Sequence, residues 1–156
     1  MVERAAMACP ALPTCGQALT ESERVLPAVV DSINRARVNS GATELPIHLR
    51  MTGCPHGCAR PYTAELGIVG RTKSTYDLYV GGSVAGERLG ERLAVGVKLA
   101  SLEEHLTALL ESHRVEALDG EGFGDFCNRM GADKLASTLT GIRREPGRSD
   151  LAADDE

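Results

Sequence analysis

Four cysteines in two loop-like segments constrain this chain more than any other feature of its sequence. Cys9 and Cys15 are separated by five residues, and Cys54 and Cys58 by three. Both pairs lie among prolines and glycines, which interrupt regular helices and permit tight turns. Thiolates are the soft ligands that iron–sulfur clusters and zinc prefer. The pattern therefore favours a four-thiolate metal site.

Several alternatives to an iron–sulfur site remain open on spacing alone. The spacing matches neither the ferredoxin patterns nor the shorter loops of a typical zinc ribbon. The cysteines could also be inert, buried, small hydrophobic side chains, although Gly/Pro loops do not favour that. A disulfide between Cys54 and Cys58 is another alternative. The fifth cysteine, Cys127, has no partner near it in the sequence, and we expect a packed or partly exposed free thiol.

The composition is that of one ordinary globular domain. Of the 156 residues, 42% are hydrophobic and 25% are charged. The net charge of −5 argues against a nucleic-acid partner, which would require a basic face. No apolar run is long enough to cross a membrane, and residues 1–20 lack the apolar core of a signal peptide. We expect a cytoplasmic protein, or a stromal one if it comes from a plastid, in which cysteines favour metal binding over disulfides.

Hydrophobic periodicity predicts a mixed α/β (α+β) domain with helices against a small sheet. Two apparent capping boxes, at 20–23 and 101–104, each predict the start of a helix. Residues 88–99 suit a strand as well as a helix or loop, and residues 8–16 are loop-like. The remaining expectations are helices ending near 39–41 and at 131–139, strands at 46–51, 66–69 and 75–80, and a glycine-punctuated segment at 121–126.

Longer stretches around the cysteines resemble the nitrite and sulfite reductases that contain sirohaem and a [4Fe–4S] cluster. The similarity spans roughly residues 7–140 and is greatest to the ferredoxin-dependent assimilatory sulfite reductases. Nitrite reductases share the cluster arrangement, but the proline-rich first loop and residues 59–62 look more like the sulfite enzymes. The ordered landmarks are ACPALPTCG (8–16) with ESER (21–24), TGCPHGCARPY (52–62) with AELGIVG (64–70), YDLYVGG (76–82) and EGFGDF (121–126).

The resemblance implies a role for each of the paired cysteines. Cys9, Cys15, Cys54 and Cys58 would be the ligands of the [4Fe–4S] cluster. Cys58 would also be the axial ligand of the sirohaem iron, so that one sulfur couples two redox centres. The chain would then be the C-terminal portion of a sulfite reductase, which reduces sulfite to sulfide with six electrons, and ferredoxin would be its electron donor.

The resemblance also implies that this portion is incomplete for catalysis alone. In the family, basic residues that bind the anionic substrate come from an N-terminal half, which we expect as a partner on the same or a separate chain. We expect a cofactor-binding domain over 1–142 and a disordered polar tail over 143–156. His56 stands where the family usually has Asn, and we interpret it as an exposed loop substitution. Arg71 and Lys73 are weaker candidates to face a sirohaem carboxylate. An electron-transfer module without sirohaem and a structural zinc domain remain alternatives.

Overall fold

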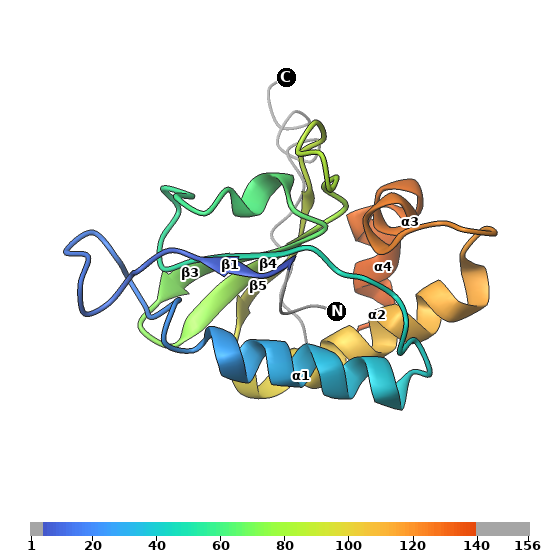
Figure 1. Cartoon of the computed structure of the whole chain (residues 1–156), viewed down its shortest axis with the longest axis horizontal. Coiled ribbons are helices and arrows are strands. Elements are labelled where there is room, and N and C mark those ends of the chain that lie inside the picture. The colour runs from blue at the N-terminus through green and yellow to red at the C-terminus, as the bar shows by residue number, and fades with distance from the viewer. Residues whose placement is uncertain (1–4, 140–156) are drawn as a thin grey trace, which may run out of the picture.

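The computed structural model of the chain describes residues 5–139. Within them, one mixed sheet has the strand order β1-β2-β3-β4-β5, with α1 and α2 on one side and α3 and α4 at one end (Figure 1). The strands are β1 (Met7–Ala8), β2 (Leu49–Thr52), β3 (Leu66–Thr72), β4 (Thr75–Val80) and β5 (Glu91–Val97). The helices are α1 (Leu26–Asn39), α2 (Leu102–Glu116), α3 (Phe123–Met130) and α4 (Ala132–Ser137), with short 3-10 helices η2 (Pro61–Thr63) and η3 (Leu99–Ser101). The predicted fold class, a small mixed sheet flanked by helices, is confirmed.

The sheet is parallel at one side and antiparallel at the other. β1 pairs with β2 and β2 with β3 in parallel, whereas β3, β4 and β5 form antiparallel pairs. Parallel neighbours need a crossover connection, and α1 lies in the crossover from β1 to β2. The connection from β2 to β3 holds only residues 53–65, including η2. As a result, the carboxyl ends of β1 and β2 lie at the same edge of the sheet.

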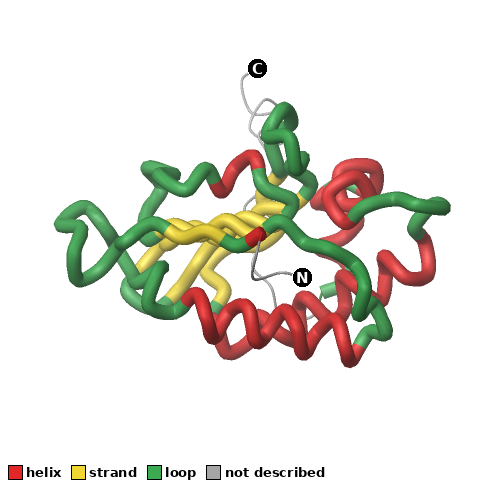
Figure 2. The backbone as a smooth tube through the Cα atoms, viewed as in Figure 1, coloured by secondary structure: helices red, strands yellow, loops and turns green. Residues whose placement is uncertain are grey.

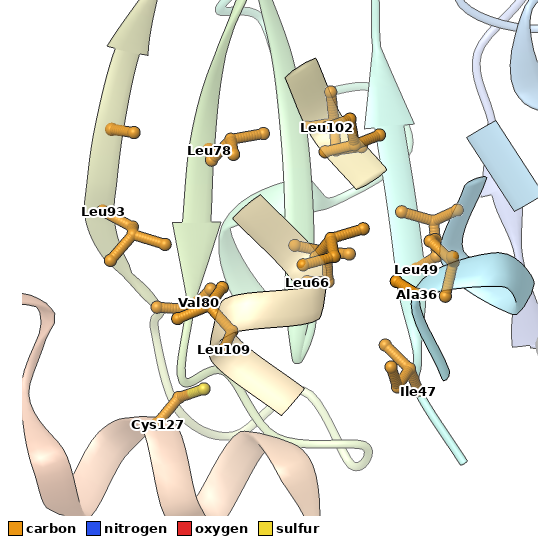
Figure 3. Packing of buried hydrophobic residues seen from close by; sticks show 14 of the residues in the cluster. Ala36, Ile47, Leu49, Leu66, Leu78, Val80, Leu93, Leu102, Leu109 and Cys127 are labelled. Carbon is orange, nitrogen blue, oxygen red and sulfur yellow. The ribbon is translucent and has the colours of Figure 1, made fainter. Parts of the chain in front are cut away.

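A hydrophobic core packs the sheet against the helices α1 and α2, and buried residues of α3 and α4 extend it. Leu49 and Met51 of β2 are fully buried, and they alternate with Arg50 and Thr52, as side chains on a strand must. Burying one such apolar side chain contributes about 1.5–3 kcal/mol. Figure 3 shows Leu49 beside Ala36 of α1, with Leu102 and Leu109 of α2 over the neighbouring strands. Arg50 and Thr52 are therefore directed to the other face of the sheet.

Neither predicted capping box forms. α1 begins at Leu26, with Pro27 in its first turn, and no side chain caps its N-terminus. The Thr20 hydroxyl instead bonds the Lys73 carbonyl at 3.1 Å and the Tyr76 hydroxyl at 3.0 Å. Ser101 does precede α2, but its hydroxyl makes no capping bond either. At Thr20, partners far away in the sequence replace the local bond that the motif predicts.

Three other segments differ from the sequence expectations or resolve them. The loop-like N-terminal segment contains a two-residue strand, β1, and the ambiguous residues 88–99 form β5. The glycine-punctuated segment begins the helix α3, where Phe123 and Phe126 are fully buried. The predicted tail over 143–156 lies outside the described residues, and none of the described helices is long and apolar enough to cross a membrane.

Candidate metal centre

The two cysteine loops leave the same edge of the sheet. Cys9 directly follows β1, and Cys54 lies two residues after the end of β2. The two loops lie at the same end of the molecule, at the left in Figure 1, and Figure 2 shows both as irregular backbone. Ligands of open α/β sheets commonly bind outside the carboxyl ends of parallel strands. A group bound at this position could therefore be surrounded by the backbone of both loops.

Gly53 joins the two loops. Its backbone N–H donates to Cys9 Sγ at 3.4 Å, and its carbonyl accepts from the N–H groups of Leu19 and Thr20 at 2.8 and 3.1 Å. A Cβ at position 53 would lie 2.5 Å from Ala11 Cβ and 2.6 Å from the Thr20 carbonyl oxygen. Only glycine allows this approach of the two backbones. The first loop is thus fixed against the residue that precedes Cys54.

Tyr62 contacts the second loop between Cys54 and Cys58. Its hydroxyl donates to the Pro55 carbonyl at 2.8 Å, and its ring packs edge-on against Tyr79 with centroids 5.0 Å apart. Burial, followed by the nearby Tyr79, raises the pKa of Tyr62 above its ordinary value, so its hydroxyl remains a donor at neutral pH. Gly57, at φ +70°, lies against the same ring. These contacts determine the path of the chain between Cys54 and Cys58.

The four predicted ligands are free thiols with different degrees of exposure. Cys54 is buried, Cys9 and Cys15 are half-buried, and Cys58 is exposed. No disulfide links Cys54 to Cys58, so that alternative is wrong for this structure. The structure brings the Cys9 and Cys54 segments into direct contact through Gly53. In residues 5–139, no three Cys, His, Asp or Glu side chains are grouped closely enough to bind one metal ion.

The donor set fits an iron–sulfur cluster in number and type. A single zinc ion needs its four ligands about 2.0–2.3 Å from one centre. In a [4Fe–4S] cluster, by contrast, each of the four thiolates binds a different iron atom. Two buried hydroxyls beside the loops, Ser22 Oγ and Thr52 Oγ1, also lack a hydrogen-bond partner within the described residues. Hydroxyls can donate hydrogen bonds to the sulfur atoms of such a cluster.

The structure bears on the sequence interpretations of His56, Arg71 and Cys127. His56 is exposed, as expected, but its Nδ1 lies 3.4 Å from Cys54 Sγ, which the sequence did not indicate. Arg71 forms an ion pair with Asp77 at 3.0 Å, so it is engaged within the sheet. Cys127 is buried in the core beneath Val80 and Leu109 (Figure 3), and burial raises the pKa of its thiol. The interpretation of Cys127 as a packed thiol is confirmed.

A basic cavity on the face of the sheet opposite α1 and α2 was missed by the sequence reasoning. Its volume is about 70 Å³, and none of its lining residues within the described chain is acidic. Arg60, two residues after Cys58, has the left-handed backbone at φ 58°. One sequence signal pointed to this face: because Arg50 alternates with the buried Leu49 and Met51, its side chain had to lie on the face of the sheet away from the core. The lining residues are His48, Arg50, Arg60, Thr63, Ala64, Ser83, Val84, Ala85 and Gly86.

The fold and the cysteine loops define a family of redox proteins. Residues 3–144 match the nitrite and sulphite reductase 4Fe-4S domain, and the chain belongs to this family. The NADPH sulfite reductase hemoprotein beta-component of Chromohalobacter salexigens is 48% identical over 140 residues, which are 90% of this chain and 24% of that protein. The ferredoxin sulfite reductase of Synechococcus elongatus is 48% identical over 151 residues, covering 94% of this chain and 24% of that protein.

Solved structures share the fold at low sequence identity. The NirA protein of Mycobacterium tuberculosis has a TM-score of 0.70 at 22% identity, over 85% of this chain and 26% of that one. Dissimilatory sulfite reductase I has a TM-score of 0.64 at 10% identity, over 92% of this chain and 55% of that one. The chain spans about a quarter of the length of the two sulfite reductases named above, because the matched region covers 24% of each.

Proposed function

We propose that this chain is the C-terminal, cluster- and sirohaem-ligating portion of a sulfite reductase. The observation that supports this most is the joining of two cysteine loops at the carboxyl ends of adjacent parallel strands, in a chain of this family. Cys9, Cys15, Cys54 and Cys58 would each bind one iron of a [4Fe–4S] cluster. When bound, the cluster and sirohaem supply the electron transfer for the six-electron reduction of sulfite to sulfide.

Cys58 is the cysteine best suited to bind a second cofactor as well. It is the exposed member of the four, so a tetrapyrrole can approach its sulfur from outside the domain. Arg60 follows two residues later and lines the basic cavity with Arg50. Guanidinium groups recognise carboxylates with paired donors. The two arginines would therefore orient a sirohaem carboxylate, and the Cys58 sulfur would bind its iron.

The remaining parts of the enzyme would come from outside the described residues. The curated relatives are about four times longer than the matched region, since that region covers 24% of each. We propose that an N-terminal half, on the same or a separate polypeptide, completes the substrate site. Ferredoxin is the proposed electron donor, supported by the match to the ferredoxin enzyme over 94% of this chain.

Anaerobic reconstitution of the 156-residue chain tests the cluster assignment. We expect roughly four iron and four sulfide per chain, with loss of most of both in Cys54→Ser and in Cys9→Ser. Cys127→Ser is the matched control, because Cys127 is buried in the core away from the loops, and it should keep the cluster. Stoichiometric zinc without sulfide in the wild-type chain would instead establish the zinc-domain alternative.

Sirohaem binding is tested by titrating the reconstituted chain with the free cofactor and recording visible spectra. We expect a spectral change that Cys58→Ser abolishes and that Arg50→Ala weakens. An unchanged spectrum in the wild-type chain, with the cluster present, would favour a simple electron-transfer module.

A further inference from the structure

Two buried hydroxyls beside the cysteine loops have no hydrogen-bond partner in the part of the chain that the structure describes. Within residues 5–139, the buried side-chain atoms without a partner are Ser22 Oγ, Thr52 Oγ1 and Arg37 Nε. The arginine atom belongs to a guanidinium whose other nitrogens bond Asn34 and the Thr43 carbonyl. Ser22 and Thr52, by contrast, are both 0% exposed, and each has only one hydroxyl to satisfy. Unpaired buried hydroxyls destabilise a fold, so each requires a physical reason.

Both hydroxyls belong to segments that bond directly to Cys9. Thr52 precedes Gly53, whose N–H donates to Cys9 Sγ, and it lies on the face of β2 opposite Met51 and the core. Ser22 precedes Glu23, whose N–H donates to the Cys9 carbonyl at 3.2 Å. Each hydroxyl therefore belongs to a residue whose neighbour in the chain is bonded through its backbone to Cys9.

Buried hydroxyls elsewhere in the described chain do find partners. The Ser40 hydroxyl donates to the Arg37 carbonyl at 3.2 Å, at the end of α1. The Thr107 hydroxyl, which is partly buried on α2, donates to the Glu103 carbonyl at 2.8 Å. Unpaired hydroxyls thus coincide with the cysteine loops, which suggests that their partner is the group the loops bind.

We propose that the Thr52 and Ser22 hydroxyls donate hydrogen bonds to sulfur atoms of the bound cluster and raise its reduction potential. This proposal rests on the proposed function, because it requires the cluster. Reduction adds negative charge to the cluster sulfurs, so a donor stabilises the reduced form more than the oxidised form. Thr52 and Ser22 are then positioning and tuning residues, which touch the cofactor without taking part in covalent chemistry.

Redox titration of the reconstituted chain, followed by electron paramagnetic resonance, tests the proposal. We expect Thr52→Val and Ser22→Ala each to increase the ratio of oxidised to reduced cluster, at a fixed potential, by about tenfold. For a one-electron couple this is a shift of about 59 mV to more negative values. Thr52→Ser, which retains a hydroxyl, should restore the wild-type potential. Ser40→Ala and Thr107→Val are controls that should leave it unchanged.

The cluster-free protein provides an independent readout. In it, Thr52→Val should melt at the same temperature as the wild type or higher, because the valine replaces a hydroxyl that has no partner. Ser40→Ala and Thr107→Val should melt lower, because each loses an existing hydrogen bond. A lower melting temperature for Thr52→Val would show that its hydroxyl is already satisfied by the protein or by water, and would overturn the proposal.

The outcomes separate this proposal from the proposed function. If the wild-type chain binds no iron and sulfide, the proposed function fails and the tuning role fails with it. If the cluster forms but Thr52→Val and Ser22→Ala leave its potential at the wild-type value, only the tuning role is overturned. The tuning role is also overturned if Ser40→Ala and Thr107→Val shift the potential as much as Thr52→Val and Ser22→Ala.

Discussion

The contact between the two cysteine loops depends on the absence of a side chain at Gly53. The spacing of the cysteines predicted the two pairs and their loop character from local sequence. It could not predict that Cys54 is buried while Cys58 is exposed, because burial depends on which distant residues pack nearby. Gly53, beside Cys54, lies against Ala11 and Thr20. The unpaired hydroxyl of Thr52 was unpredictable for the same reason, since a hydroxyl's partners are determined by tertiary structure.

Gly53→Ala should loosen the junction between the loops. The new methyl group would meet Ala11 Cβ at 2.5 Å and the Thr20 carbonyl oxygen at 2.6 Å. Overpacking of this kind typically costs about 1–3 kcal/mol, measured as the free energy of unfolding in urea. Gly16→Ala, in the first cysteine loop, is the control, because nothing lies within 4 Å of its added methyl group. Equal effects from the two substitutions would contradict the importance of the close approach.

Glu121 should make the stability of the chain depend on pH in the acid range. Its carboxylate accepts two bonds from Arg129, both at 2.7 Å, and one from the Leu118 N–H at 3.0 Å. These bonds, those from Arg129 first, lower the pKa of Glu121 to about 2. A carboxyl group whose pKa is depressed in the folded state contributes stability above its unfolded pKa, and loses that contribution as the pH falls.

Glu121→Gln should therefore destabilise the protein at neutral pH and much less under acid conditions. The difference in melting temperature between wild type and variant should be constant above pH 5 and shrink as the pH falls towards about 2. Lys134→Gln is a suitable control, because its exposed ion pair with Glu116 should contribute little at any pH. A difference that stays constant down to pH 2 would contradict the role of the Arg129 bonds.

Periodic elements were predictable, including the short helix α4 within the expected 131–139, whereas β1 and α3 were not. α2 and the strand β4 follow from alternating or helical apolar positions that the core then buries. α3 was missed because Gly122 and Gly124 indicated a loop. In the structure, Gly124 lies against the buried Glu65 carboxylate, which accepts its N–H at 3.0 Å and also accepts from the His48 N–H at 2.9 Å. The contact with Glu65 explains why a glycine occupies position 124 inside a helix, which local helix propensity could not explain.

The histidines of α2 show the same limit. His105 is buried, and burial lowers its pKa below the ordinary value. His113 lies 5.0 Å from the Phe126 ring, centroid to centroid, so it contacts α3. Helical periodicity places residues on a face but does not reveal that a second helix covers that face.

The packing of α2 provides a test at the scale of the element. Leu109 is fully buried against the sheet, and Leu109→Ala should reduce the free energy of unfolding by about 2–5 kcal/mol. Val115, on the same helix, is 72% exposed, and Val115→Ala should change it by less than about 0.5 kcal/mol. Urea denaturation of both variants measures the difference. A small loss for Leu109→Ala would mean that α2 does not pack on the sheet as described.

At the scale of the whole molecule, the fold is that of one segment shared by much longer relatives. The sequence landmarks predicted the family because they include residues whose roles are geometric, such as the glycines that approach other backbones closely. They did not reveal the basic cavity formed by Arg50, Arg60 and the residues near Ser83, because those residues are distant in sequence and come together only in the folded sheet.

Cofactor removal should lower the stability of the whole domain. A group that binds only the folded chain stabilises it by mass action. We expect the reconstituted chain to melt at a higher temperature than the same chain stripped by a chelator, by roughly 2–4 °C for each 1 kcal/mol of binding stabilisation. Cys54→Ser, treated identically, should show no such gap. Identical melting curves for the loaded and stripped wild-type chain would argue against a cofactor held by both loops.

The pairing of β1 with β2 has a consequence for the order of events in the cell. Met7 lies beside Arg50 in the sheet, so the loop of Cys9 meets the loop of Cys54 only after the intervening helix has crossed over. A delivery protein that donates a preassembled cluster would then have to act on a chain whose second strand has already been synthesised and docked. Cofactor insertion would therefore follow the docking of β2 beside β1.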